Sequence, residues 1–332
     1  MATIREVSRL AGVSNATVSR VLNGTVPVSP EVTERVLAAV EQLGYRPNAF
    51  ARGLVTNRSG GLGVCVNDVA SPYFGLLIRG VEAEAEAAGM HLLVSSGHAV
   101  AEQERAGLEF LADRRSDALV AHIEAMPDDA LAEYLARPTP LILVGRKLEG
   151  HEERCVYLDN EAGGVLATRH LLEHGHTRIG HITGPERFPD SRARRRGFEG
   201  AMRAVGLEPD GRLVIEADFE EAGGFRAMRE LLERDPGLTA VFAGNDQMAA
   251  GAFAALRESG RNIPDDVSVV GYDDVLLARY LHPTLTTIRQ PLEEMGRAAA
   301  RAALALLANE GTEVRNRFDP QLVSRQSVAR PR

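Results

Sequence analysis

Long apolar runs and cysteines are both scarce in this chain of 332 residues. No window approaches the ~18 consecutive apolar residues of a membrane span, and the opening MATIREVSRL lacks the apolar core of a secretion signal. The two cysteines, Cys65 and Cys155, have neither C-x-x-C nor metal-ligand spacing, so neither a disulfide framework nor a zinc site is predicted. We therefore expect a cytoplasmic protein that binds no metal and no membrane.

Catalytic and nucleotide-binding motifs are missing too. No Walker loop, G-x-S-x-G elbow or H-E-x-x-H is present, and no G-x-G-x-x-G follows the first predicted strand. His170, His174 and His176 flank a turn at Gly175, and the last turn of a helix favours histidine without any metal. The arginines at 194–196 could hold a phosphate, but consecutive helical residues point in different directions, which favours solvated surface. The sequence therefore predicts neither an enzyme nor a cofactor.

The composition is that of an ordinary globular protein, with 44% hydrophobic and 25% charged residues. At ~150 residues per domain, the length corresponds to about two domains. Residues 1–60 hold seven arginines against four glutamates, a balance of +3, and since the whole chain carries −8, the rest carries −11. This asymmetry favours an acidic body with a head that can approach a polyanion, although +3 over 60 residues could also arise by chance.

The first part of the chain predicts three short helices. A capping box at 3–6 begins the first helix, Gly12 ends it, and Ser14 can cap a second helix over 15–22. A serine–proline pair then predicts the start of a third helix, which ends at Gly44. Two short amphipathic helices joined by a glycine-containing turn make a helix-turn-helix, although any small three-helix domain could show this pattern.

The outward face of the second helix favours DNA as the partner. Arg20 suits the O6 and N7 acceptors of guanine, and Asn15 suits adenine. Ser14, Thr17 and Ser19 are of the right size to bond phosphates and fix the register. A face that is merely solvated would more typically carry glutamate and lysine.

The segment 48–55 follows this head and could form a short helix capped by Asn48. Eight residues are well below the ~12–15 that an isolated helix needs in water, and Gly53 weakens the helix further. Such a segment either packs on something or stays flexible until it binds. The alternative is a plain linker to the next domain.

From residue 61 onward, short apolar runs alternate with alanine-rich helical patterns. The runs include 62–66, 91–94, 118–121, 141–144, 178–182, 240–243 and 267–271. This alternation predicts parallel sheets with helices on both faces, and about ten strands favour two doubly wound subdomains over one sheet. Ligands of such folds bind outside the carboxyl ends of the strands, where Asn245, Asp246 and Asp273 follow two of the runs. Asparagine and aspartate also favour helix N-caps, so one residue of a pair could cap while the other faces the ligand.

Long motifs throughout the chain resemble those of the lactose-repressor (LacI/GalR) family of bacterial transcription regulators. The first motifs are TIREVSRLAGVSNATVSRVLNG and VSPEVTERVLAAVEQLGYRPNAFARGL. The later ones are SPYFGLLIRGVE, HLLEHGHTRIGHITGP, TAVFAGNDQMAAGAFAALRESG, IPDDVSVVGYDD and HPTLTTIRQP. The resemblance covers nearly the whole chain, and motifs this long in this order are very specific.

The resemblance implies how the head would read DNA. Asn15, Ala16 and Arg20 match the base-reading positions of the family, and Leu54 matches a leucine that wedges into the minor groove at the operator centre. The predicted DNA-binding set is Thr3, Ser14, Asn15, Ala16, Thr17, Ser19, Arg20, Asn23 and Leu54. The expected partner is a pseudo-palindromic double-stranded operator with a central CG step.

For the body, the resemblance implies a fold like that of a periplasmic sugar-binding protein, with a cleft between two subdomains. The predicted effector-binding set is Tyr73, Phe74, Arg192, Phe219, Asn245 and Asp273. Its polar members match positions that bond sugar hydroxyls, and Phe219 matches the aromatic residue that packs on the sugar ring. Tyr73 and Phe74 match aromatics of the cleft wall, although they could also be plain core. Gly145 replaces a carboxylate of some members, which leaves the identity of the sugar open.

These inferences combine into one domain plan and one function. The plan has three parts: a helix-turn-helix head at 1–46, a hinge helix and linker at 47–60, and an effector-binding and dimerisation domain at 61–332. The last part divides into subdomain one at about 61–160 plus 289–320 and subdomain two at about 161–288 plus 321–330. The function is that of a repressor whose operator affinity is controlled by a small ligand, a sugar. A purine or nucleoside effector, and a sugar-binding protein without a regulatory role, are the alternatives. A homodimer is expected, because no C-terminal heptad repeat is present to join two dimers.

Overall fold

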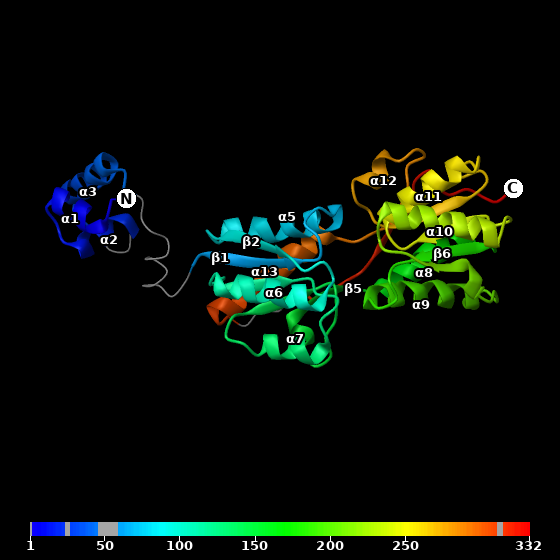
Figure 1. Ribbon diagram of the computed structural model, residues 1–332, viewed down its shortest axis with the longest axis horizontal. Coiled ribbons are helices and arrows are strands. Elements are labelled where there is room, and N and C mark those ends of the chain that lie inside the picture. The colour runs from blue at the N-terminus through cyan, green and yellow to red at the C-terminus, as the bar shows by residue number, and fades with distance from the viewer. Residues whose placement is uncertain (1, 24–26, 46–58, 311–314) are drawn as a thin grey trace. The chain divides into compact units, whose positions relative to one another are not determined.

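The computed structural model describes residues 2–23, 27–45, 59–310 and 315–332. The chain folds as two units, residues 1–60 and residues 61–332 (Figure 1). Each unit has a buried apolar core of its own. No helix among the described residues is long and apolar enough to cross a lipid bilayer.

The first unit contains the predicted helix-turn-helix and a third helix. Its helices are α1 (Ile4–Ala11), α2 (Asn15–Asn23) and α3 (Pro30–Leu43). The capping box is formed, because the Thr3 N–H donates to the Glu6 carboxylate at 2.7 Å and the Glu6 N–H donates to the Thr3 hydroxyl at 3.4 Å. Gly12 ends α1 at a φ of 63°, a left-handed conformation that glycine adopts without strain. The buried core of this unit is Val7, Ala11, Val18, Val36 and Ala39.

Two six-stranded sheets form the frame of the described part of the second unit (Figure 1). The first consists, in spatial order, of β11 (Arg317–Phe318), β5 (Cys155–Leu158), β4 (Leu141–Val144), β3 (Ala118–Ala121), β1 (Gly61–Val66) and β2 (His91–Ser96). The second consists of β12 (Gln321–Val323), β10 (Thr286–Arg289), β9 (Ser268–Asp273), β8 (Ala240–Ala243), β6 (Ile179–Thr183) and β7 (Val214–Glu216). Neighbouring strands are parallel except for β12, which is antiparallel to β10. The two predicted parallel-sheet subdomains are confirmed.

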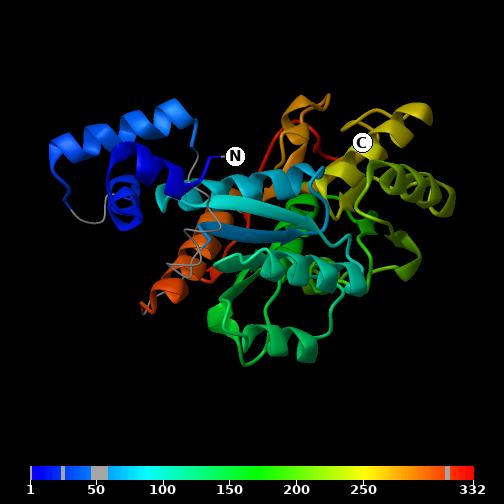
Figure 2. The same ribbon diagram turned by 60° about the vertical axis from the view of Figure 1, so that its left-hand side comes forward.

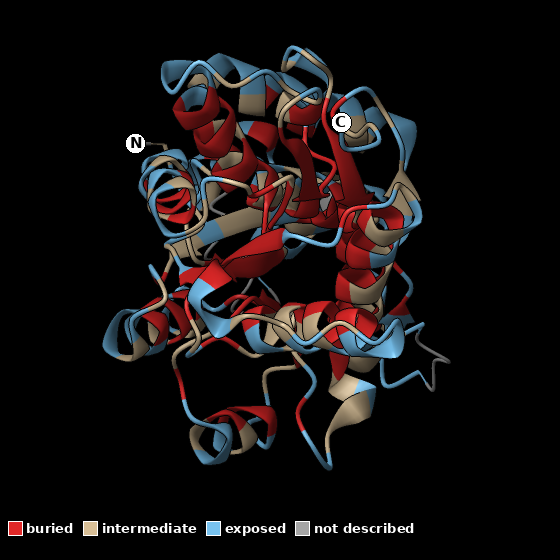
Figure 3. Cartoon of the chain, turned by 90° about the vertical axis from the view of Figure 1, so that its right-hand side faces the viewer, coloured by how far each residue is buried: buried red, intermediate tan, exposed pale blue. Residues whose placement is uncertain are grey.

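Helices cover both faces of each sheet. Those of the first sheet are α5 (Pro72–Ala87), α6 (Ala101–Asp113), α7 (Asp128–Leu135) and α13 (Leu292–Ala308). Those of the second are α8 (Asn160–Glu173), α9 (Pro189–Ala204), α10 (Glu221–Arg234) and α11 (Asp246–Glu258), followed by the short α12 (Leu277–Tyr280). Figure 2 shows α5 and α6 on opposite sides of β1 and β2; α13 packs beside α5, and α7 lies on the face of α6. On the second sheet, α8 and α9 share one face, and α10 and α11 share the other. The buried residues therefore fill the sheets and the inward faces of the helices (Figure 3).

Three described connections join the two sheets. They run from β5 into α8, from β10 into α13, and from β11 into β12. The strands β5, β10 and β11 are parallel to their neighbours, and β12 returns antiparallel to β10. All three connections therefore leave at the carboxyl edge of a sheet.

Three helix pairs cross at backbone contact, with one glycine on each helix. A Cβ atom at Gly80 of α5 would lie 2.1 Å from the Glu293 carbonyl oxygen of α13. A Cβ atom at Gly296 of α13 would lie 2.2 Å from the Leu77 carbonyl oxygen of α5. The other crossings use Gly164 and Gly197 for α8 and α9, and Gly224 and Gly251 for α10 and α11. Since interior packing leaves no space at these contacts, a side chain at any of the six would force the helices apart.

Candidate functional site

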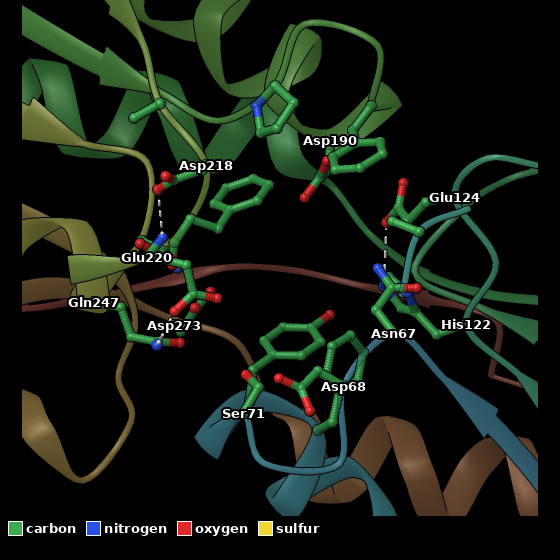
Figure 4. Close-up of a pocket in the computed structure, with 18 of the residues that line it drawn as sticks. Asn67, Asp68, Ser71, His122, Glu124, Asp190, Asp218, Glu220, Gln247 and Asp273 are labelled. Carbon is green, nitrogen blue, oxygen red and sulfur yellow. Dashed lines mark hydrogen bonds and ion pairs between the residues drawn. The ribbon is translucent and has the colours of Figure 1, made fainter. Parts of the chain in front are cut away.

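A cavity of about 430 Å³ lies between the carboxyl edges of the two sheets (Figure 4). Its lining comes mainly from the segments that follow β1, β3, β6, β7 and β8 and from the end of β9. The carboxyl edge is where open α/β sheets bind ligands, and the volume lies within the ~300–1,000 Å³ of small-molecule sites. Seven carboxylates and two arginines line the described cavity, so negative charge predominates there.

Arg194 of α9 is a buried arginine that lines the cavity. Its Nε donates to Asn160 Oδ1 at 2.9 Å, its Nη1 donates to the Gly244 carbonyl at 2.6 Å, and its Nη2 lies 3.1 Å from the Asp190 carboxylate. The guanidinium also lies over the Tyr272 ring, 4.0 Å from the ring centroid. Burial acts to lower the pKa of Arg194, but the negative charge of Asp190 opposes it, and the net result is a raised pKa. Arg194 is therefore a fixed cation at the cavity surface.

Asp273 ends β9 beside this arginine. Its backbone has a φ of 110°, which L-residues rarely adopt, and its Oδ1 accepts a hydrogen bond from Gln290 Nε2 at 2.6 Å. Burial raises the pKa of Asp273 to about 7 despite the opposing charge of Arg194 and the Gln290 bond, and Asp190 adds to the increase. The carboxyl group therefore titrates near neutral pH.

The raised pKa of Asp273 makes the stability of the second unit depend on pH. Because the folded pKa of about 7 exceeds the unfolded value, the carboxyl proton stabilises the fold at low pH, and this stabilisation is lost as pH rises towards 7. The free energy of unfolding of the wild type minus that of Asp273→Asn should therefore decrease by about 1.4 kcal/mol per pH unit from pH 5 to 7. Above pH 7 this difference should level off. Urea unfolding of both proteins at pH 5, 6, 7 and 8 measures this difference.

Asp265→Asn provides the control for that series. Asp265 is an exposed carboxylate paired with Arg332, so its replacement should give a difference that does not change between pH 5 and 8. A pH-independent difference for Asp273→Asn as well would contradict the prediction.

Asn245 and Phe219 line the cavity and are bonded to each other. The Asn245 Oδ1 caps α11 by accepting the Met248 N–H at 2.8 Å, and its Nδ2 donates to the Phe219 carbonyl at 2.9 Å. Phe219 has a φ of 68°, and its ring is parallel to that of Phe188 with centroids 6.3 Å apart. Asn245 therefore caps a helix and also fixes the backbone that presents an aromatic face to the cavity.

Tyr73, Phe74 and His122 form an aromatic group on the side of the first sheet. The His122 ring lies edge-to-face with both, at centroid distances of 4.9 Å from Phe74 and 5.9 Å from Tyr73. All three residues line the cavity, so Tyr73 and Phe74 both pack and face it. The His122 Nε2 lies 3.4 Å from Glu124 Oε1. Burial lowers the pKa of His122 to about 4, so this ring is neutral at pH 7.

The expectation for Arg192 is corrected by the structure. Arg192 is exposed, donates from Nη1 to the carbonyls of Glu186 and Arg187 at 2.8 Å each, and does not line the cavity. Two residues along a helix correspond to about 200° of rotation, so Arg192 and Arg194 point to nearly opposite sides of α9. Arg194 takes the place in the cavity that the resemblance gave to Arg192.

Several other residues that line the cavity were not predicted from the sequence as effector-binding residues. His122 and Glu124 follow the predicted strand 118–121, and Asn67 follows 62–66. The strand-end rule that selected Asn245 and Asp273 also covers these positions. Asp190 had no comparable signal, because it lies in the first turn of a helix, where aspartate is common for electrostatic reasons alone.

The predicted DNA-reading residues lie on α2 or at its start. Asn15, Ala16 and Arg20 are exposed. Ser14 caps the helix, with the Thr17 N–H donating to its hydroxyl at 3.1 Å, and the two hydroxyls are 2.9 Å apart. Of the remaining members, Thr3 is used in the capping box, Ser19 is partly exposed, Asn23 ends α2, and Leu54 lies outside the described residues. The unit therefore presents a short polar and basic helix face without an acidic residue.

Comparison with known proteins gives two family matches. Residues 3–48 match the family described as bacterial regulatory proteins, lacI family, and residues 168–328 match the periplasmic binding protein-like domain. The chain is 42% identical over 332 residues to the HTH-type transcriptional regulator GalR of Escherichia coli (strain K12), which covers 100% of this chain and 97% of the relative.

Solved structures give the same result. The lac repressor dimer bound to operator and the anti-inducer ONPF is 28% identical with a TM-score of 0.88, and the match covers 99% of both chains. The complex of the transcriptional regulator CelR with cellobiose is 37% identical with a TM-score of 0.73, covering 98% of this chain and 100% of that one. The match to each structure therefore includes both the head and the cavity.

Proposed function

Because the chain belongs to the lacI family of bacterial regulatory proteins, and is therefore a DNA-binding transcription regulator and not an enzyme, we propose that a neutral saccharide in its cavity controls its affinity for an operator. The observation that supports a saccharide as the ligand is that an aromatic ring and fixed polar groups line the same cavity. Phe219 offers a ring for the apolar face of a sugar, while Arg194 and Asp273 offer a donor and an acceptor for its hydroxyls. The similar CelR structure contains cellobiose, which supports the same ligand class.

The charge of the cavity favours a neutral ligand over an anionic one. Seven carboxylates surround two arginines, and Asp190 already pairs with one of these, Arg194. A phosphorylated sugar or nucleotide would bring further negative charge into this partly buried space, where like charges are costly. Hydroxyl groups, by contrast, can donate to carboxylates without adding charge.

A ligand screen tests this proposal directly. Thermal unfolding of the full chain should be followed with D-glucose, D-galactose and cellobiose, and with adenine, hypoxanthine, adenosine and glucose 6-phosphate. A bound ligand at about 100 times its Kd stabilises the protein by about 2.7 kcal/mol, which raises the unfolding temperature by several degrees. Stabilisation by a purine or by the phosphate alone, with no effect of the neutral sugars, would overturn the proposed ligand class.

For DNA, we propose a homodimer on a pseudo-palindromic operator, with Asn15, Ala16 and Arg20 contacting bases and the other predicted residues contacting the backbone. A pseudo-palindromic operator has a two-fold symmetry axis that matches the two-fold axis of a dimeric protein. The similar lac repressor structure is a dimer bound to its operator. The family resemblance adds a central CG step that Leu54 would open. Ser14 and Thr17 would present their hydroxyl groups to phosphates at the start of α2.

The role of Arg20 leads to a prediction about base discrimination. On an operator obtained by selection of bound sequences, Arg20→Ala should lose about 1–3 kcal/mol of discrimination at one base pair per half-site, because the bidentate contact to guanine is removed. Arg20→Lys is the matched control, since it keeps the charge but loses the planar fork. Titration of the operator and of scrambled DNA should show discrimination lost in both variants, with scrambled-DNA affinity retained in Arg20→Lys. Equal weakening on both DNAs would make Arg20 a phosphate contact.

A further inference from the structure

The helix α6 ends in a turn that glycine forms elsewhere in the second unit. Four other helices, α5, α8, α9 and α11, end in a left-handed turn whose residue is a glycine with a φ of 70–92°, namely Gly89, Gly175, Gly206 and Gly260. In α13 the residue is Asn309, a common substitute for glycine. In α6 it is Arg115, with a φ of 58° and its N–H donating to the Ala112 carbonyl at 2.8 Å. Because a side chain makes this conformation unfavourable, Arg115 makes the fold less stable than a glycine would.

The fold makes little use of Arg115 or of its neighbour Arg114. Both side chains are exposed, and neither forms an ion pair with another described residue. Arg114 lies over the Phe110 ring of its own helix, 5.4 Å from the ring centroid. A positive charge at a helix C-terminus is favourable, but Arg114, with an ordinary φ of −77°, already provides one. The arginine at position 115 therefore indicates a role outside the fold.

Arg115 lies at the edge of the first sheet where the chain enters from residues 1–60. Two residues after Arg115, the Asp117 N–H donates to the Gly61 carbonyl at 2.7 Å, and Ala118 then pairs with Leu62 in the register of β3 and β1. This is the amino edge of the sheet, opposite to the edge that holds the cavity (Figure 1). Arg114 and Arg115 are therefore beside the point where the second unit is joined to the helix-turn-helix unit.

The length of the chain limits how far this edge can lie from bound DNA. The proposed function places Leu54 in the minor groove at the operator centre, and seven peptide steps lead from Leu54 to Gly61. At about 3.6 Å per residue, Gly61 stays within about 25 Å of the floor of the groove. The groove is about 7.5 Å deep, so the phosphates on its rim are closer to Gly61 than the floor is. The edge with Arg114 and Arg115 is therefore held close to the DNA backbone.

We propose that Arg114 and Arg115, which we call the edge arginines, bind backbone phosphates beside the operator centre, so that the second unit contributes directly to DNA affinity. This inference rests on the proposed function, from which it takes the position of Leu54. The guanidinium group matches the geometry of a phosphate, and a homodimer presents each edge arginine twice. Contacts to phosphates carry no sequence information, so the edge arginines raise affinity without changing the preferred sequence.

The test measures binding of the full chain to an operator obtained by selection of bound sequences, at about 0.05–0.2 M KCl. Arg115→Gly removes two phosphate contacts per dimer, so the slope of log K against log salt should become less steep by about 2. Affinity at about 0.1 M salt should fall about 10- to 60-fold. Arg115→Lys keeps the charge and should retain most of the slope. Asp113→Asn removes an exposed negative charge beside the edge arginines and should strengthen binding.

Stability separates a DNA contact from a structural role. Because glycine relieves the left-handed backbone, Arg115→Gly should raise the Tm by about 2 °C while it weakens DNA binding. If Arg115 served only the end of α6, the same variant would lower the Tm and leave the salt slope unchanged. Arg115→Gln and Arg257→Gln form a matched pair, since Arg257 is an exposed arginine near the end of α11 on the second sheet. Only Arg115→Gln should change the slope.

Neutral DNA linkages locate the contact. Methylphosphonates in place of the phosphates beside the operator centre should weaken binding by the wild type. For Arg115→Gly the further loss should be smaller, because both changes remove the same contact. Fully additive losses, or a wild-type salt slope in Arg115→Gly, would overturn the inference.

The outcomes distinguish this inference from the proposed function. If the wild type enriched no sequence from random DNA, or if Leu54→Ala bound the operator as the wild type does, the proposed mode of DNA binding would fail and the inference with it. If an operator is enriched and Leu54→Ala weakens its binding, an unchanged salt slope in Arg115→Gly overturns the role of the edge arginines alone.

Discussion

Replacing Arg194 with methionine should lower the free energy of unfolding by about 3–5 kcal/mol and abolish the response to sugar. Methionine fills much of the space of the side chain but leaves Asp190 without its cation and removes the donors to Asn160 and Gly244. Breaking a buried pair from one side is costly because the remaining charge stays uncompensated. Urea unfolding measures the stability, and thermal unfolding with D-glucose, D-galactose and cellobiose measures the response.

Arg192→Met is the matched control for this result. Arg192 lies in the same helix, is exposed, and donates only to two backbone carbonyls. Its replacement should change the free energy of unfolding by no more than about 0.5 kcal/mol and leave sugar binding intact. If Arg192→Met abolished the sugar response while Arg194→Met retained it, the assignment of the cavity arginine would be reversed.

Replacing Glu104 with glutamine should cost about 3 kcal/mol of stability and also weaken sugar binding. The carboxylate accepts three consecutive backbone N–H groups after β3, and an amide would direct an NH2 group at one or more of them. The segment 124–126 would then lose the bonds that position Glu124. Glu104 thus acts through Glu124 and does not line the cavity itself.

Glu109→Gln on the same helix is the comparison for Glu104→Gln. Glu109 bonds Tyr134 and Arg137 at the surface, and its side chain is 44% exposed. Since exposed ion pairs contribute little, this variant should stay within about 1 kcal/mol of the wild type and bind sugar normally. A similar small loss for Glu104→Gln would show that the segment after β3 keeps its conformation without the carboxylate.

The fold could be predicted further than the site, for physical reasons visible in particular residues. The alternation of apolar runs with helical patterns reports burial, which both sheets share, and the strand-end rule correctly brought Asn245 and Asp273 to one cavity. Which arginine of α9 enters the cavity depends on helix phase; the resemblance implied Arg192, whereas Arg194 lines the cavity. Glu104 carried no sequence signal, because a glutamate in a helix normally lies in solvent, and only tertiary structure shows the three amides that it accepts.

The three connections at the carboxyl edges have a mechanical consequence. Because the helix pairs of each subdomain meet at backbone contact, we expect any relative motion of the two subdomains to be concentrated in those connections, which lie at the edge that also holds the cavity. Gly61 stands at the opposite, amino end of β1, and six residues of strand place it about 20 Å away. A rotation of the first subdomain about these connections would move residues near the cavity only slightly. It would move Gly61, where the chain enters from residues 1–60, further, because the displacement grows with the distance from the axis of rotation.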